Sequence, residues 1–206
     1  GLALPITGDP AAGIVAGPTI ESVAILGHDY PTMKPRMLVA AGDRVKRGQA
    51  LFEDRKSEGV VFTAPGAGTI RAINRGEKRK FLSIVIDLSD AEKTGDVSAA
   101  DKVSFSAYTG AGADSMSGDD VRALMAESGL WTAIRQRPFD RVPSPSDECA
   151  AVFVTATNSN PLAGSMVDIC AGKEDLLLTG LTAINKITSG ATYFCVDASW
   201  KTDVSK

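Results

Sequence analysis

The sequence predicts an α+β, multi-domain chain in which an all-β half precedes an α/β half. In the first half, short runs of β-forming residues alternate with turns rich in Gly, Pro and Asp. After residue 117, helical periodicity appears, and a strand, a helix and a second strand follow one another. With 206 residues the chain has room for about two domains, which we place at residues 1–100 and 101–206.

The β half is defined by the turns between its strands. Gly42 and Gly48 sit in two tight turns, because glycine adopts the backbone conformations that such turns need. The apolar runs 50–52 and 60–62 predict two strands joined by a polar surface hairpin over residues 53–59. After Pro65 breaks the run, further strands are predicted at residues 68–73, which alternate polar and apolar, and at residues 81–88.

This order of turns and strands resembles the biotinyl/lipoyl-like barrel-sandwich hybrid, the domain that carries biotin or lipoate on a hairpin lysine. Lys56, the one lysine of the hairpin, comes five residues after Leu51, short of the place where carriers hold theirs. Its neighbours Arg55 and Ser57 also differ from the carrier motifs. We expect a carrier fold without its cargo, and a biotin- or lipoate-type carrier module modified at Lys56 stays open as an alternative.

The α/β half begins at a helix signal. Ser117 is a helix cap with Asp120 as its capping-box partner, and Gly129 is a natural stop. A strand at residues 150–155, a helix at 173–188 and a strand at 192–196 predict a parallel βαβ unit, as part of a Rossmann-like α/β domain. One such unit cannot cover both faces of a sheet, so we expect it to belong to a larger domain.

The chain divides near residues 90–118, which are small and polar. Gly110, Gly112 and Gly118 resemble a dinucleotide-binding loop only superficially, because no strand precedes them and the third glycine is misplaced. We expect a flexible linker there.

Composition excludes several classes of function. A net charge of −3 gives no general argument for nucleic-acid binding. No apolar run approaches the roughly 20 residues of a membrane span, and no signal peptide is visible at the start, which lacks Met. Three cysteines without a C-x-x-C motif and a single histidine argue against iron–sulfur or zinc sites and fit a reducing cytoplasm.

Two segments are candidates for ligand binding. Residues 155–162 follow the first strand of the α/β half, where open α/β sheets bind ligands, but they include no acid, base or nucleophile. Residues 127–139 bring Trp131, Phe139, Arg135 and Arg137 close together in the sequence. Core packing explains the aromatic residues, and an apolar ring ligand with polar oxygens, which an Arg would hydrogen-bond, is the alternative.

Several blocks, in order along nearly the whole chain, are similar to the A subunit of the sodium-translocating NADH:quinone oxidoreductase (Nqr). They read GLALPI (1–6), VAILG (23–27), KP (34–35), GQALFED (48–54), VVFTAP (60–65), INRGEKR (73–79), ESGLWTA (127–133), RPF (137–139), FVTA (153–156) and NPLA (160–163). The family's chain is longer, so the resemblance implies an N-terminal fragment of it.

The resemblance implies a peripheral subunit on the cytoplasmic face of the bacterial inner membrane, in a pump that oxidises NADH, reduces ubiquinone and exports sodium. Its partners would be the other Nqr subunits (B to F), including membrane subunits. The family is related to the flavoprotein subunit of complex I and to the C subunit of the Rnf complex, but holds no cofactor. Flavins and an iron–sulfur centre lie on the partner subunits.

The sequence fits a chain without cofactors. Where the flavoprotein relatives have a glycine-rich phosphate loop, residues 131–137 contain no glycine, so close backbone approach to a phosphate is lost. Where those relatives have acidic residues after the first strand, this chain has Asn158, Ser159 and Asn160. We expect no catalytic residue, no metal and no bound cofactor in this chain.

In the family, quinone contact is placed near the segments that match residues 26–33 and 134–141. The candidate quinone-binding residues are Gly27, His28, Tyr30, Met33, Trp131, Arg135, Arg137 and Phe139. His28 and Pro31 depart from the residues usual in the family. A lone histidine such as His28 is more often a surface residue than a ligand, and Tyr30 and Met33 are equally explained as core residues. A pure assembly domain, in which Trp131 or Arg137 serves complex formation alone, is a further alternative.

Overall fold

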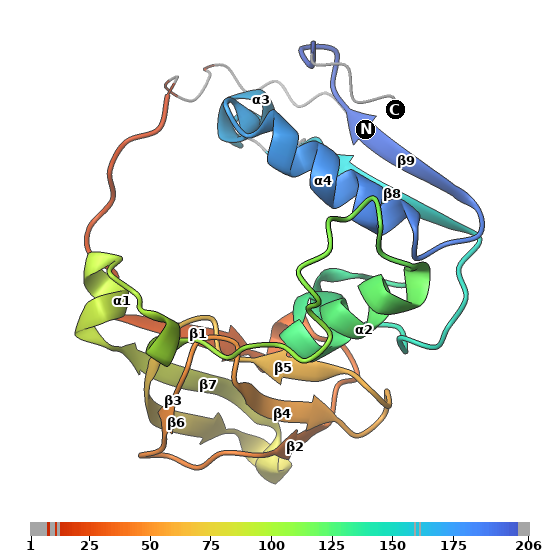
Figure 1. The fold of residues 1–206 in the computed structure, drawn as a ribbon. Helices are drawn as coiled ribbons and strands as arrows, with labels where there is room; N and C mark the ends of the chain where they lie inside the picture. The colour runs from red at the N-terminus through yellow and green to blue at the C-terminus, as the bar shows by residue number, and fades with distance from the viewer. Residues whose placement is uncertain (1–7, 9–10, 12, 159, 161, 202–206) are drawn as a thin grey trace. The chain divides into compact units, whose positions relative to one another are not determined.

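A computed structural model of the chain describes residues 8, 11, 13–158, 160 and 162–201. They form two compact units. The first unit holds Pro18–Gly110 and Arg122–Asp147; the second holds Ala111–Val121 together with the described residues up to 17 and from 148 onward. The chain thus passes between the units several times, and the domain boundary near residue 100 stays a prediction. Figure 1 labels the elements of both units.

The first unit is built from two antiparallel sheets. The four-stranded sheet has the order β1-β7-β6-β3, and the three-stranded sheet has the order β2-β4-β5 (Figure 1). The strands span β1 (Ser22–Leu26), β2 (Pro35–Met37), β3 (Arg44–Val45), β4 (Ala50–Asp54), β5 (Val61–Thr63), β6 (Gly68–Arg75) and β7 (Phe81–Leu88). The strands predicted at residues 50–52, 60–62, 68–73 and 81–88 are confirmed, with ends that differ by up to two residues.

The core of the first unit lies between these sheets and is closed by aromatic rings. Phe52 stacks on Phe62 with ring centroids 4.5 Å apart, and Phe81 lies 5.2 Å from Phe52. Leu51 and Phe52 are neighbours in sequence, yet both are fully buried. A register shift between Ala50 and Phe52 explains this, since a bulge breaks the alternation of faces along a strand. Each such side chain stabilises the fold by about 1.5–3 kcal/mol.

The β4–β5 hairpin is less exposed at its base than the sequence predicted. Asp54 was expected on the surface but is only 9% exposed. One of its oxygens, Oδ1, accepts hydrogen bonds from the backbone N–H groups of Lys34 and Lys56, each at 3.0 Å. The carboxylate thus ties the hairpin to the segment before β2, a role that depends on a partner 20 residues away and has no local signal.

Residues 90–110, predicted to lie between the two halves, belong to the first unit. They include helix α1 (Asp90–Thr94) and the 3-10 turn η3 (Ala99–Asp101). The Glu92 carboxylate, 5% exposed, accepts from Arg47 Nε at 3.0 Å and from the Ala67 backbone at 2.7 Å. The Arg47 backbone also bonds Asp101 and Val103. The contacts of Glu92 and Arg47 tie α1 and the chain after it to the sheets. Residue composition alone did not reveal this attachment.

Helix α2 (Gly118–Ser128) leads the chain back to the first unit, which it joins from Arg122 onward. The capping box predicted at its start is confirmed, since Ser117 Oγ accepts from the Asp120 N–H and Asp120 accepts from the Ser117 N–H. At its end the Ser128 carbonyl accepts from Thr63 Oγ1 of β5 at 2.8 Å. Gly129 then turns the chain at φ 80° into the 3-10 turn η4 (Leu130–Ala133).

The second unit contains the predicted parallel βαβ unit. Strands β8 (Ala151–Ala156) and β9 (Ala191–Val196) pair in parallel, and helix α4 (Glu174–Asn185) forms the crossover after the short helix α3 (Met166–Cys170). Residues 110–118 do not behave as the flexible linker that we expected. Lys186 Nζ donates to the backbone carbonyls of Asp114 and Met116, at 2.7 and 2.6 Å, and so holds this segment.

A glycine substitution tests how tightly α2 docks on β5. A Cβ on Gly129 would lie 2.4 Å from Thr63 Oγ1, whereas a Cβ on Gly110, which has the same φ of 80°, would meet nothing within 4 Å. We expect Gly110→Ala to cost about 1–2 kcal/mol of unfolding free energy from backbone strain. Gly129→Ala should cost about 1–3 kcal/mol more, because it also creates a clash. Urea denaturation measures both, and equal losses would contradict the docking.

The Glu92 contacts predict a pH-dependent stability. The hydrogen bond from Arg47 is the main cause that lowers the pKa of Glu92 below its usual 4.5. The stabilisation by the ionised Glu92 carboxylate is therefore fully present above its usual pKa of 4.5. It is lost as the pH falls through the lower pKa of the folded state. Glu92→Gln should destabilise the chain by about 1–3 kcal/mol at neutral pH, and the difference from the unchanged chain should shrink in acid.

Thermal unfolding across the acid range measures this difference. Asp90→Asn is the control, because Asp90 lies on the same helix with a fully exposed side chain. A Glu92→Gln difference that persists unchanged in acid would show that charge plays no part in the contact.

Candidate functional site

The two segments predicted to contact a quinone both belong to the first unit. The first begins where β1 ends at Leu26 and runs through the 3-10 turn η1 (Gly27–Asp29). Tyr30 follows, and its ring packs edge-on against Phe62, with centroids 4.7 Å apart and planes at 88°. Since Phe62 is a core residue, the position of Tyr30 is fixed by the core.

The second segment reaches Tyr30 through Arg135. The Arg135 Cζ atom lies 4.6 Å from the centre of the Tyr30 ring, which is a cation–π distance. Arg135 Nη2 donates to the Asp29 carbonyl at 3.1 Å, across 106 residues of sequence. Its Nη1 donates to the Thr132 carbonyl at 2.7 Å. The structure therefore brings the two predicted segments together, and we call His28, Asp29, Tyr30 and Arg135 the Tyr30–Arg135 cluster.

The remaining members of the first segment have distinct surroundings. The His28 side chain is 75% exposed and its Nε2 lies 3.1 Å from Asp29 Oδ1. Gly27 packs closely on β7, because a Cβ there would lie 2.4 Å from the Phe81 carbonyl oxygen. Met33 is half-buried. Among the candidate residues of this segment, His28 is thus the exposed one, while Gly27 sets the path of the backbone.

Trp131, which precedes the second segment in the sequence, is a core residue rather than a surface residue. Its side chain is buried, its Nε1 donates to the Pro143 carbonyl at 2.9 Å, and the Arg122 guanidinium lies 5.6 Å from its ring. Of the two explanations left open for this aromatic residue, core anchoring fits the burial. Trp131 therefore positions the chain that leads to Arg135.

Arg137 and Phe139 lie further along the same segment and are both exposed. Arg137 Nη1 is 3.7 Å from Asp140 Oδ1, and Phe139 is 71% exposed. In the described part of the chain, no hydrogen bond, ion pair or ring contact joins either residue to Tyr30. Their contact with a ligand stays a prediction.

The cluster offers hydrogen-bond donors beside an aromatic ring. Of the five N–H donors of a guanidinium, Arg135 uses two on backbone carbonyls, which leaves three for another acceptor. The His28 imidazole adds a further polar group at the surface. A flat ring with carbonyl oxygens fits this combination, because the oxygens accept hydrogen bonds while the ring packs on apolar surface. Sequence reasoning missed the two carbonyls that orient Arg135, since backbone acceptors carry no side-chain signal.

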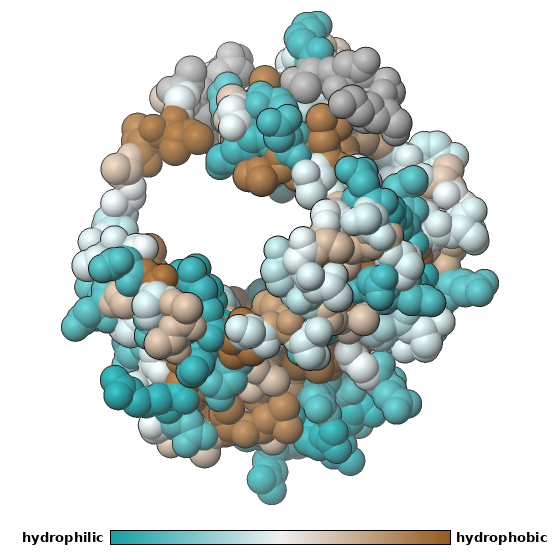
Figure 2. Space-filling model, in the orientation of Figure 1, coloured by the Kyte–Doolittle hydropathy of each residue, from teal (hydrophilic) through white to brown (hydrophobic). Residues whose placement is uncertain are grey.

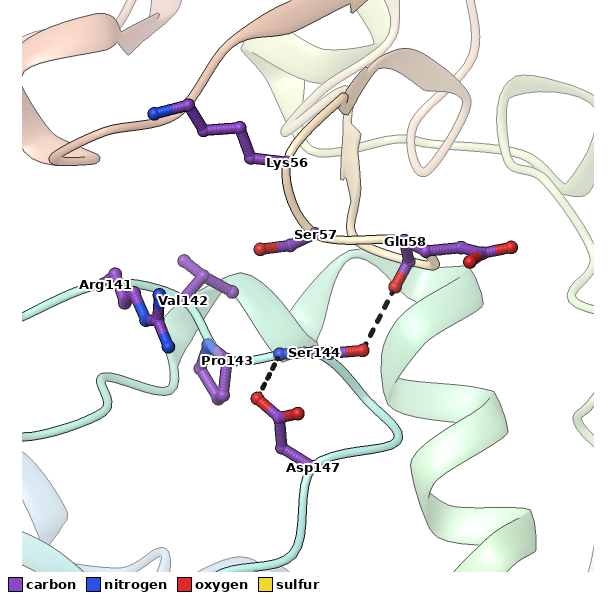
Figure 3. A pocket seen from close by; sticks show the side chains of 8 residues that line it. All are labelled: Lys56, Ser57, Glu58, Arg141, Val142, Pro143, Ser144 and Asp147. Carbon is purple, nitrogen blue, oxygen red and sulfur yellow. Dashed lines mark hydrogen bonds between the residues drawn. The ribbon is translucent and has the colours of Figure 1, made fainter.

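The hairpin tip that holds a lysine in carrier domains is tethered in this chain. A pocket of about 300 Å³ lies beside it, lined by Lys56, Ser57, Glu58, Arg141, Val142, Pro143, Ser144 and Asp147 (Figure 3). Ser144 Oγ donates to the Glu58 carbonyl at 3.4 Å, and the Ser144 N–H donates to Asp147 Oδ2 at 3.1 Å. The Lys56 side chain is exposed and extends away from Ser144 and Asp147.

Neither a metal centre nor a membrane span is found in the part of the chain that the structure describes. No three His, Cys, Asp or Glu side chains there are grouped so as to hold a metal ion. None of the described helices has the length and apolar character to cross a bilayer. At the other candidate segment, Asn158 Oδ1 accepts from the Asn160 N–H at 3.1 Å, while Ser159 and Pro161 lie outside the described residues.

Two models of protein-family domains match this chain, one in each half. The model of the NqrA N-terminal barrel-sandwich hybrid domain matches residues 1–89, and that of the NqrA second alpha/beta domain matches residues 116–206. The predicted fold class, a barrel-sandwich hybrid followed by an α/β domain, is therefore confirmed.

Curated proteins show the same relationship. The chain is 45% identical over 198 residues to the A subunit of the Na(+)-translocating NADH-quinone reductase of Photorhabdus laumondii and 43% identical over 195 residues to that of Cellvibrio japonicus. These alignments cover 96% and 95% of the chain but only 42% of each relative. The corresponding protein of Haemophilus influenzae is 44% identical over 187 residues, which is 91% of the chain and 40% of the relative. The chain belongs to the NqrA family, the A subunits of Na(+)-translocating NADH-quinone reductases.

The carrier alternative makes a separate prediction about Lys56. Because the hairpin tip is tethered and its lysine is displaced from the carrier position, we expect no biotin or lipoate on this residue. Intact-mass measurement of the chain, produced in cells with active biotin and lipoate ligases, tests this. An adduct that disappears in Lys56→Arg would contradict the expectation.

Proposed function

We propose that this chain is part of a cofactor-free, peripheral subunit of a sodium-translocating NADH:quinone reductase, and that it binds ubiquinone at the Tyr30–Arg135 cluster. The family relationship supports the assignment to the complex. The observation that carries the quinone site is the contact of Arg135 with Tyr30 and Asp29, which unites two segments 106 residues apart.

In this proposal the chain binds and orients, and the redox chemistry takes place on other subunits. Flavins and an iron–sulfur centre on the other Nqr subunits (B to F) would carry the electrons from NADH. The protein would lie at the cytoplasmic face of the bacterial inner membrane, in contact with membrane subunits. The chain itself supplies no catalytic residue and no metal ligand.

Each residue of the site has a proposed role. Arg135 donates a hydrogen bond to one quinone oxygen with the N–H groups that the backbone carbonyls leave unused. His28, which is mostly exposed, is placed to bond the second oxygen or to shield it from water. Tyr30 and Met33 offer apolar surface for the ring, Gly27 and Trp131 position the two segments, and Arg137 and Phe139 form the outer rim.

The cation–π contact should also help to assemble the site. An arginine held over an aromatic ring contributes roughly 0.5–2 kcal/mol, depending on how far it is desolvated. The contact fixes the guanidinium plane before any ligand arrives, which lowers the entropy lost on binding.

Substitution of Arg135 tests the quinone site. In the complete complex, we expect Arg135→Gln to weaken binding of a quinone analogue by roughly 10- to 150-fold, because one charge-assisted hydrogen bond is worth roughly 1.5–3 kcal/mol. Titration of the analogue into the purified complex, together with the KM for quinone in the NADH-driven reaction, measures the loss.

The control is Arg44→Gln, which removes an exposed arginine of β3 outside both segments. It should leave the affinity unchanged. If Arg135→Gln keeps full affinity while the complex assembles normally, the quinone site is wrong. If the variant protein fails to join the complex but binds the analogue as before, the chain serves assembly alone.

A further inference from the structure

The turn between β6 and β7 concentrates positive charge at one end of the first unit. Arg75, Lys78, Arg79 and Lys80 are all exposed there, with Glu77 as the one carboxylate among them. This gives the turn a net charge of +3, in a chain whose overall net charge is −3. The ion pairs found among the described residues involve none of these four cations. Figure 2 shows a hydrophilic surface at the lower edge of the molecule, where this turn lies in Figure 1.

The turn presents these charges on a defined backbone. The Gly76 N–H donates to the Lys80 carbonyl at 2.8 Å, and the Arg79 N–H donates to the Gly76 carbonyl at 3.1 Å. Arg75 Nη1 donates to the Arg79 carbonyl at 3.3 Å. Lys78 and Arg79 adopt φ values of 51° and 59°, a left-handed conformation that residues with a Cβ rarely adopt. Two consecutive cations in this conformation direct the charge outward at a conformational cost, which suggests a functional reason.

An apolar side chain accompanies the cations. Leu82, at the start of β7, is 46% exposed and packs over the turn, since a Cβ on Gly76 would lie 3.3 Å from it. An exposed leucine beside several unpaired cations is the combination that binds anionic bilayers. The cations attract the negative headgroups, their long stems and the leucine reach into the interface, and each Lys or Arg adds to the affinity.

We propose that the β6–β7 turn, residues 75–80 with Leu82, docks on the surface of an anionic lipid bilayer and so orients the first unit toward the membrane. An acidic protein surface would satisfy the charges, but it gives no reason for the exposed leucine among them. The inference rests on the proposed function in one respect, which is that a sodium-translocating complex works at a membrane. The turn is distinct in sequence from the Tyr30–Arg135 cluster.

A vesicle flotation assay with the 206-residue chain tests the proposal. The vesicles contain phosphatidylcholine with phosphatidylglycerol, or phosphatidylcholine alone. The test variant is Arg75→Gln, Lys78→Asn, Arg79→Asn, Lys80→Gln. Asn at the two left-handed positions removes charge from residues whose backbone conformation it tolerates better than most residues do, so the variant should fold at least as well as the unchanged chain. The matched control removes four other exposed cations of the same unit, Arg44, Lys46, Arg55 and Lys56, by substitution with Gln.

We expect the unchanged chain and the control to float with the phosphatidylglycerol vesicles at low salt and to be released by high salt. The turn variant should lose roughly a thousandfold in partitioning, and Leu82→Ser should lose less. Equal binding by the turn variant and the control would overturn the proposal. Failure of the unchanged chain to float would also overturn it. If the turn variant then lost binding to an acidic partner protein, the turn would be assigned to a protein contact.

The outcome is separable from that of the quinone experiment. The turn variant should bind the quinone analogue as the unchanged chain does, because no residue of the cluster is altered. Normal flotation with no quinone binding would remove the quinone site and leave the membrane contact standing.

Discussion

The packing of residues 122–147 on the two-sheet unit is the interaction on which the candidate site depends. At one end, Gly129 brings the end of α2 against Thr63 of β5, so closely that a Cβ on residue 129 would clash with the Thr63 side chain. Trp131 then anchors the chain in the core, and Arg135 reaches the ring of Tyr30. Without this packing, Tyr30 would still lie on Phe62, but the Arg135 guanidinium would not face it. A segment that follows the barrel in the sequence thus completes a surface of the barrel itself.

Under the proposed function, the same packing lets a carrier-like fold keep its shape without a cargo. Carrier domains present a lysine on a free hairpin tip, whereas this tip is held by the Ser144 hydrogen bond to Glu58 and by the Asp54 carboxylate at its base. The core beneath, formed by Phe52, Phe62 and their neighbours, does not depend on a modified lysine. In the proposed function, these sheets position one surface for a ligand and another for a partner.

Sequence patterns predicted strands β4 to β7, the helix cap at Ser117 and the βαβ unit, because these features depend on neighbours within a few residues. They did not predict that Glu92 would bond Arg47, or that residues 101–110 would belong to the first unit, since both depend on partners far along the chain. The candidate segments came from family resemblance, and their meeting through Arg135 and the Asp29 carbonyl has no side-chain pattern to reveal it. The sequence left core packing and ligand contact open for Trp131, and its burial favours core packing.

The central claim is that one quinone occupies a surface built from both segments. Photolabelling of the complete complex with a light-activated quinone analogue, followed by peptide mapping, tests it most directly. The account predicts label in residues 26–33 and in residues 134–141, with both signals suppressed together by excess unlabelled quinone. Label confined to other subunits, or label in these segments that excess quinone does not suppress, would contradict it.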